Sequence, residues 1–119
     1  MSGFDQAKQY FAGAATVSWV TGGAATDSSE LDVRGYSKGA FKLPATEFDT
    51  NTISFKASKE SGGTFVAIHG KTGSLISLTA PTGPVWVDFP PEVFAHGFIK
   101  IVTGTATGDA AVAEVVLKT

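Results

Sequence analysis

The sequence predicts an all-β fold: an antiparallel two-sheet β-sandwich, jelly-roll-like, with eight or nine short strands. Fourteen glycines and five prolines are spread along the 119 residues, which disfavours long helices. Residues 53–58 alternate apolar and polar side chains, as in a strand with one buried face. Ser61-Gly62-Gly63 then supplies a tight reversal, and residues 64–68 form the returning strand of a β-hairpin.

The other strands follow from the same alternation, with turn residues between them at roughly ten-residue spacing. We expect strands at residues 16–21, 30–33, 41–43, 53–58, 64–68, 74–79, 85–89, 98–103 and 111–118. The strand at 30–33 suits a sheet edge because charged residues alternate with Leu31 and Val33. Residues 90–97 begin with two prolines and end with glycine, which predicts one helical turn.

The first dozen residues are the exception to the β pattern, because their apolar residues recur at helical spacing. Phe4 and Phe11 share a helical face, and Tyr10 adds a third aromatic ring. Aromatic side chains on so short a segment would be exposed unless they pack on a neighbour. We therefore expect residues 1–14 to form an N-terminal arm or short helix that contacts a partner, and residues 15–119 to form the sandwich domain.

Composition excludes several classes of function. The chain has no cysteine, so disulfides, thiolate metal sites and cysteine nucleophiles are excluded. The net charge is −2 and Arg34 is the single arginine, so no basic stripe is present for nucleic acid. No apolar run approaches the roughly 20 residues that span a bilayer, and no secretory signal is visible. We expect one domain made in the cytoplasm, without nucleic-acid or membrane contact.

No catalytic constellation is visible. His69 and His96 are flanked by no nucleophile or carboxylate motif, so we interpret both as structural or surface residues, although two distant histidines could converge on a metal. Asp27, Glu30 and Asp32 could offer oxygen ligands to a hard cation, but they match no calcium loop and are typical of a solvated loop. We therefore expect no enzymatic activity, no cofactor and no metal site.

Three aromatic residues outside the N-terminal segment are candidates for binding. Trp19, Tyr36 and Trp86 have the ring faces that a sugar-binding surface uses. Trp86 alternates with Val85 and Val87, and we expect it in the core because buried aromatics outnumber exposed ones. Trp19 and Tyr36 lie nearer to turns, which favours a role at an interface.

Several stretches resemble a family of small virion structural proteins, encoded among the head and tail genes of tailed bacteriophages and prophages. They are residues 35–45, the hairpin at 53–65 with its Gly-Gly-Thr-Phe, residues 94–105 with Phe-Ile-Lys-Ile, and the valine-rich last strand. The resemblance covers about residues 28–118. The family usually has an aspartate in the hairpin turn, where this chain has Glu60-Ser61.

The resemblance implies a capsid decoration, or cement, protein that binds the major capsid protein and stabilises the head. It also implies a homo-oligomer, with a trimer favoured, on the capsid surface of the virion. Phe4, Tyr10, Phe11, Trp19 and Tyr36 are the residues that we expect to contact the capsid or another partner. Two alternatives remain open: a carbohydrate-binding module on a virion surface, and a head–tail connector or tail component.

Overall fold

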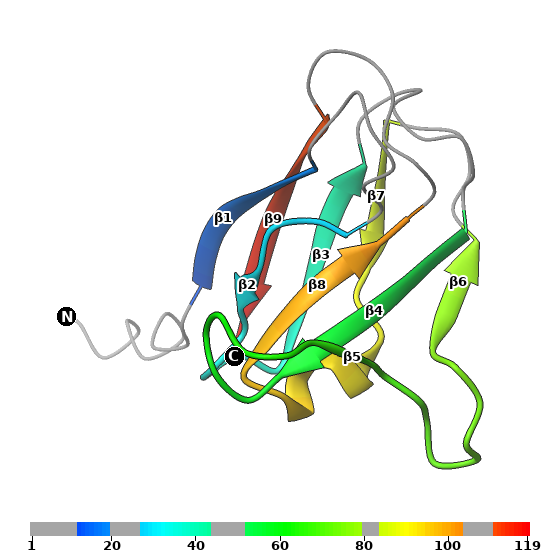
Figure 1. Ribbon diagram of the computed structural model, residues 1–119. Helices are drawn as coiled ribbons and strands as arrows, with labels where there is room; N and C mark the ends of the chain where they lie inside the picture. Colours follow the sequence, from blue (N-terminus) through cyan, green and yellow to red (C-terminus); the bar gives the residue numbers. More distant parts are fainter. Residues whose placement is uncertain (1–11, 20–26, 44–51, 80–83, 104–110) are drawn as a thin grey trace, which may run out of the picture.

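The computed structural model describes residues 12–19, 27–43, 52–79, 84–103 and 111–119. These residues form nine strands and a short 3₁₀-helix, η2, shown in Figure 1. The elements are β1 (Ala12–Trp19), β2 (Leu31–Asp32), β3 (Lys38–Leu43), β4 (Thr52–Ser58), β5 (Val66–Ala67), β6 (Ser77–Thr79), β7 (Val85–Asp88), η2 (Pro91–Ala95), β8 (Phe98–Val102) and β9 (Ala111–Lys118). Among them, no helix is long and apolar enough to cross a membrane.

The strands form two antiparallel sheets that face each other. One sheet, here called sheet A, has the order β1-β9-β3-β7, and the other, sheet B, has the order β2-β8-β4-β5, with β6 also paired to β4 (Figure 1). The first and last strands pair, and the chain passes repeatedly from one sheet to the other, as in a jelly roll. The predicted all-β, jelly-roll-like sandwich is therefore confirmed.

Three phenylalanine rings join the two sheets at the centre of the core. Phe41 of β3 and Phe55 of β4 are both 0% exposed, and their ring centroids lie 6.2 Å apart. Phe89, which follows β7, lies 4.8 Å from Phe41 and 6.0 Å from Phe55. Because the three rings come from both sheets, their packing fixes which face of each sheet is buried.

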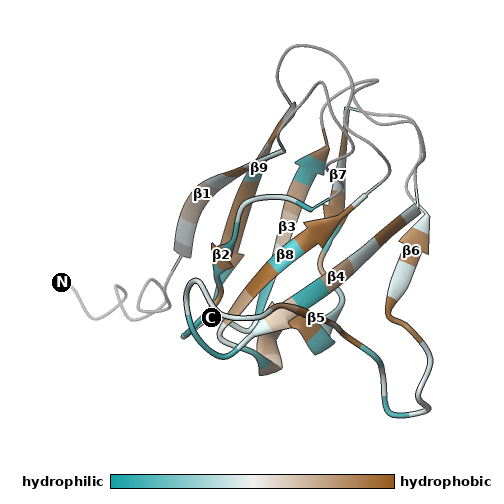
Figure 2. Cartoon of the chain, in the orientation of Figure 1, coloured by the Kyte–Doolittle hydropathy of each residue, from teal (hydrophilic) through white to brown (hydrophobic). Residues whose placement is uncertain are grey.

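The strands alternate between core and solvent around these rings, as their hydropathy suggests (Figure 2). The last strand follows the prediction: Ala113, Val115 and Leu117 are buried, and the residues between them are exposed. Such alternation is the pattern of a sheet that packs on one face only.

The prediction that the Trp86 ring is buried is wrong. The indole is 47% exposed, whereas Val85 and Val87 on either side pack against the core. In the antiparallel register Trp86 lies opposite Lys42, so both side chains point away from the core. Because Val85 and Val87 take the inner face of β7, Trp86 between them takes the outer face.

The central hairpin is wider than predicted. The reversal lies at the expected place, where the Gly63 amide donates to the Glu60 carbonyl at 3.2 Å and Gly62 has a φ of +72°. Ladder pairing, however, resumes only with β5, whose Val66 lies opposite Ala57. The strand at residues 64–68 is therefore shorter than the sequence suggests.

The first strand begins at Ala12, inside the segment that we expected to be an arm. All eight of its residues pair with β9, so the sandwich includes residues 12–14. Phe4, Tyr10 and Phe11 lie outside the described residues, as does the predicted end of this strand at residues 20 and 21.

We predict that Phe55→Ala lowers the free energy of unfolding by about 3–5 kcal/mol, because it removes a fully buried ring and leaves a cavity between the sheets. Chemical denaturation followed by tryptophan fluorescence measures this change. Lys71→Ala, in an exposed turn, serves as the control and should change stability by less than about 0.5 kcal/mol. A loss below about 1 kcal/mol for Phe55→Ala would contradict this core arrangement.

Candidate partner-binding surfaces

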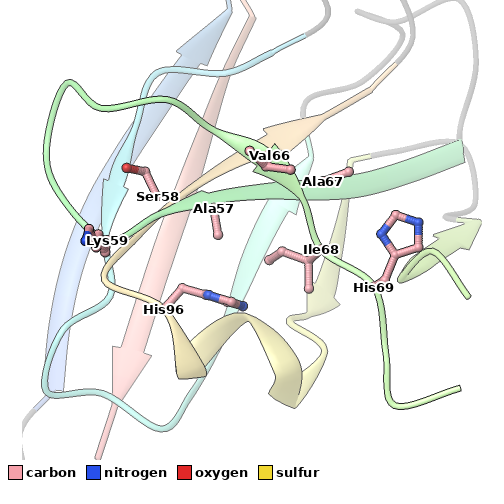
Figure 3. A pocket seen from close by; sticks show the side chains of 8 residues that line it. All are labelled: Ala57, Ser58, Lys59, Val66, Ala67, Ile68, His69 and His96. Carbon is pink, nitrogen blue, oxygen red and sulfur yellow. The ribbon is translucent and has the colours of Figure 1, made fainter. Parts of the chain in front are cut away.

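A small hollow opens beside β4 and β5, where the inner face of sheet B extends past sheet A. Its volume is about 230 Å³, and its lining includes Ala57, Val66, Ile68 and His96 (Figure 3). Val66 lies opposite Ala57, so it projects from the core-facing side of the sheet, yet it is 64% exposed. The hollow is therefore an uncovered margin of the core, too small for most drug-sized ligands.

Both histidines line this hollow, but they do not face each other. The imidazole of His96 points toward Ile68, whereas that of His69 points away from it (Figure 3). None of the lining residues is acidic, and within the described ranges no group of three His, Cys, Asp or Glu is placed to hold a metal ion. The sequence left open that the two histidines converge in space. Both do line this hollow, whose lining contains no acidic residue.

The three carboxylates at Asp27, Glu30 and Asp32 bind different protein partners. Asp27 forms an ion pair with Lys56 of β4 at 2.9 Å. Asp32 forms an ion pair with Arg34 at 2.8 Å. Asp27 therefore joins a distant segment, whereas the Asp32 pair is local and exposed, as the interpretation of a solvated loop implies.

Glu30 fastens the wide hairpin loop to the segment before β2. Its carboxylate accepts hydrogen bonds from the Ser61 hydroxyl and, at 2.9 Å, from the Gly62 amide. These bonds favour the ionised form and hold the pKa of Glu30 below its usual range, with the Ser61 bond as the largest cause. The hydrogen bonds from Arg34 lower the pKa of Asp32 in the same way.

The aromatic interface candidates have different environments. Trp19 is 4% exposed and belongs to the core, next to Val17 on the inner face of β1. Tyr36 is half-buried, and its hydroxyl lies where a side chain at Gly13 would be, so the ring covers the backbone of β1. Of the two, only Tyr36 retains substantial exposed area for a partner.

The outer face of sheet A carries both apolar and charged side chains. Across adjacent strands, Glu114, Lys42 and Trp86 lie in one row, and Lys42 is 3.8 Å from the Glu114 carboxylate. Val116 and Val112 of β9 are 37% and 46% exposed on the same face. Sequence reasoning missed this surface because it placed Trp86 in the core.

Comparison with solved structures finds the same fold in the crystal structure of the SPBc2 prophage-derived protein YomS. The likeness has a TM-score of 0.56 and covers 92% of this chain and 96% of YomS, with 16% sequence identity. Two chains this different in sequence share the fold over nearly their whole lengths. No protein-family model and no curated protein matches the sequence.

We predict that Glu30→Gln destabilises the protein at neutral pH and that the difference from the unchanged protein disappears in acid. The folded-state pKa of Glu30 is lowered, so its contribution is complete above the ordinary value of 4.5 and is lost as the pH falls through the lower folded value. Thermal unfolding midpoints of both proteins across this range measure the effect.

Glu92→Gln is the matched control, since Glu92 is an exposed carboxylate of η2. Its unfolding midpoint at neutral pH should be close to that of the unchanged protein, because an exposed substitution changes stability by less than about 0.5 kcal/mol. A Glu30→Gln deficit that persisted unchanged in strong acid would show that the carboxylate charge is not what fastens the loop.

Proposed function

We propose that this protein is a bacteriophage virion structural protein, a capsid decoration protein that binds the major capsid protein and stabilises the head. The observation that carries the proposal is the fold shared with a prophage-derived protein over 92% of this chain and 96% of the other. The resemblance of residues 28–118 to small head and tail proteins points in the same direction. A connector or tail component would use the same fold with a different partner.

The exposed surfaces support a role in binding. Trp86, Val112 and Val116 are exposed on the outer face of sheet A, while Val66 and Leu75 are exposed elsewhere in the described residues. Where exposed apolar side chains gather on one face, they are typical of contact surfaces. The proposal assigns no catalytic step and no cofactor to the chain, and it places the protein on the virion surface as a homo-oligomer.

Residues 2–11 are the second part of the proposed contact. They carry Phe4, Tyr10 and Phe11 and lead directly into β1. If copies of the protein are joined as an oligomer, several such contacts on one particle would reinforce one another.

We predict that the protein co-sediments with purified empty capsids of the phage or prophage that encodes it, and that deletion of residues 2–11 abolishes this binding. The deletion stops before β1, so circular dichroism should be unchanged. Lys71→Ala, in the exposed turn, is the control and should bind like the unchanged protein. Full occupancy after the deletion would remove the arm from the proposal, and absence of binding by the complete chain would contradict the capsid role.

Electron microscopy of the same particles separates the capsid from the connector. An even distribution over the shell indicates decoration. Attachment at a single vertex indicates a connector instead.

Carbohydrate binding is a second candidate, which the exposure of Trp86 favours. The ring is 47% exposed on a sheet face beside Lys42 and Glu114. An aromatic face can stack on a sugar ring while neighbouring charged groups bond its hydroxyls.

We predict that, if this face binds sugars, a glycan array gives signals that Trp86→Ala removes and Val112→Ala retains. Both side chains are exposed on the outer face of sheet A, but only one is aromatic. An array without signal, or signals insensitive to Trp86→Ala, would eliminate this candidate.

A further inference from the structure

Among the described residues, the outermost strand of sheet A has an open backbone edge. β1 follows β9 at the end of the order β1-β9-β3-β7, and its eight residues pair with β9 on one side only (Figure 1). Strands at a sheet edge present a row of amide and carbonyl groups that another strand can bind.

The hydrogen bonds of Ser18 show which residues of β1 direct their backbone groups away from β9. Its carbonyl accepts from the Ser29 amide at 2.8 Å, and its amide donates to the Ser29 hydroxyl at 3.1 Å. Both groups therefore point away from β9. Since backbone groups alternate along a strand, Ala14 and Thr16 also direct their amides and carbonyls outward. Within the described part of the chain, no backbone or side-chain group bonds to these two residues.

The other described sheet edges carry protection that β1 lacks. β2 has two residues and includes Asp32, and β5 also has only two residues. β7 has four residues, contains Asp88 and is followed directly by Phe89 and Pro90. Short length, charge and nearby proline are the usual defences of an edge strand. β1 is eight residues long and contains neither a charged residue nor a proline.

The absence of charge distinguishes β1 from the other long strands. Each of the other described strands of four or more residues contains at least one charged side chain. In a two-fold antiparallel contact, a charged side chain near the axis lies close to the same charge of the second copy, and like charges directly opposite each other are destabilising. The exposed side chains of Ala14, Ala15 and Thr16 are small and neutral, so β1 can approach its own copy without like charges opposing.

We propose that β1 is a self-association edge, at which it pairs antiparallel with β1 of a second copy of this chain. Ser29 already occupies the edge at Ser18, so the new pairing centres on residues 14–16. With Ala15 on the two-fold axis, Ala14 of each copy lies opposite Thr16 of the other, which gives about four backbone hydrogen bonds. The two copies of sheet A then form one continuous eight-stranded sheet.

The charged side chains nearest to the two-fold axis do not lie opposite like charges in this arrangement. Glu114 of β9 lies opposite Thr16 of β1. On the other side of Thr16 come Ala14 and then Val116 of the second copy, and neither is charged. Two strands lie between the two Glu114 side chains, which are also offset by two residues along the strands. The inference does not depend on the capsid role, and it specifies a pair of copies where the family resemblance implies three.

The first test is the mass of the complete chain in solution, measured by sedimentation equilibrium from micromolar to millimolar concentration. We expect the mass to rise from one chain to two. The double variant Ala14→Lys with Thr16→Lys places like charges directly opposite each other across the axis and should remain at one chain throughout. Val112→Lys adds a charge to the same face at an exposed position of β9 beside Ser18, and should associate like the unchanged protein.

A cross-link tests the register. The chain has no cysteine, so Ala15→Cys introduces a single thiol. Residues opposite each other without mutual hydrogen bonds have Cα atoms about 4.5 Å apart, within the range of a disulfide. Mild oxidation should give a disulfide-linked dimer of Ala15→Cys in high yield, whereas Val112→Cys, exposed one strand away, should give little.

A mass that stays at one chain over the whole series overturns the proposal. So does a three-chain mass, or a two-chain mass that the lysine pair leaves unchanged, because each shows that association does not use β1. Circular dichroism and thermal unfolding of every variant check that it is folded. Capsid binding is measured separately, so a failure of either idea is distinguishable from a failure of the other.

Discussion

The packing of Phe41, Phe55 and Phe89 is the contact on which the rest of the molecule depends. One ring comes from each sheet, and the third follows β7 and touches both, with centroid separations of 4.8–6.2 Å. In a chain without cysteine, apolar packing of this kind holds the two sheets together, and the three rings lie at the centre of a larger apolar core. Once these rings meet, the inward or outward direction of each side chain in their strands is determined.

This constraint explains where the exposed apolar side chains lie. With Val85 and Val87 turned inward beside the rings, Trp86 is left on the outer face, next to Lys42. Sheet B extends past sheet A at β5, which leaves Val66 on the core-facing side but uncovered. The exposed apolar groups are thus consequences of how the two sheets overlap, and they supply the surfaces through which the proposed virion role would act.

Sequence patterns predicted the parts of the fold that depend on local alternation. The buried faces of β4 and β9, with Ile53, Phe55 and Ala57 and with Ala113, Val115 and Leu117, agree with the alternation, although Ser58 at a polar position of β4 is also buried. Trp86 was placed wrongly because Val-Trp-Val is apolar at every position, so alternation alone does not say which face is inside. Trp19 was favoured for an interface because it lies near a turn, although it shares the inner face of β1 with Val17.

The contacts between distant segments could not be predicted from local patterns. The Ser61 hydroxyl bonds to Glu30 across 31 residues, and Lys56 bonds to Asp27 across 29. Nothing within either segment specifies its partner, because the pairing follows from the jelly-roll order. The hollow that brings His69 and His96 together has the same origin, since its walls come from β4, β5 and the segment after η2.

Residue-resolved amide hydrogen exchange along β1 tests the central claim most directly. If β1 pairs with β9 along one edge in the register described, the amides of Ala15 and Val17, which face β9, should exchange slowly at all concentrations. Those of Ala14 and Thr16 should exchange rapidly in dilute protein and become protected as the protein is concentrated. Equal protection of all four amides in dilute solution would contradict the account.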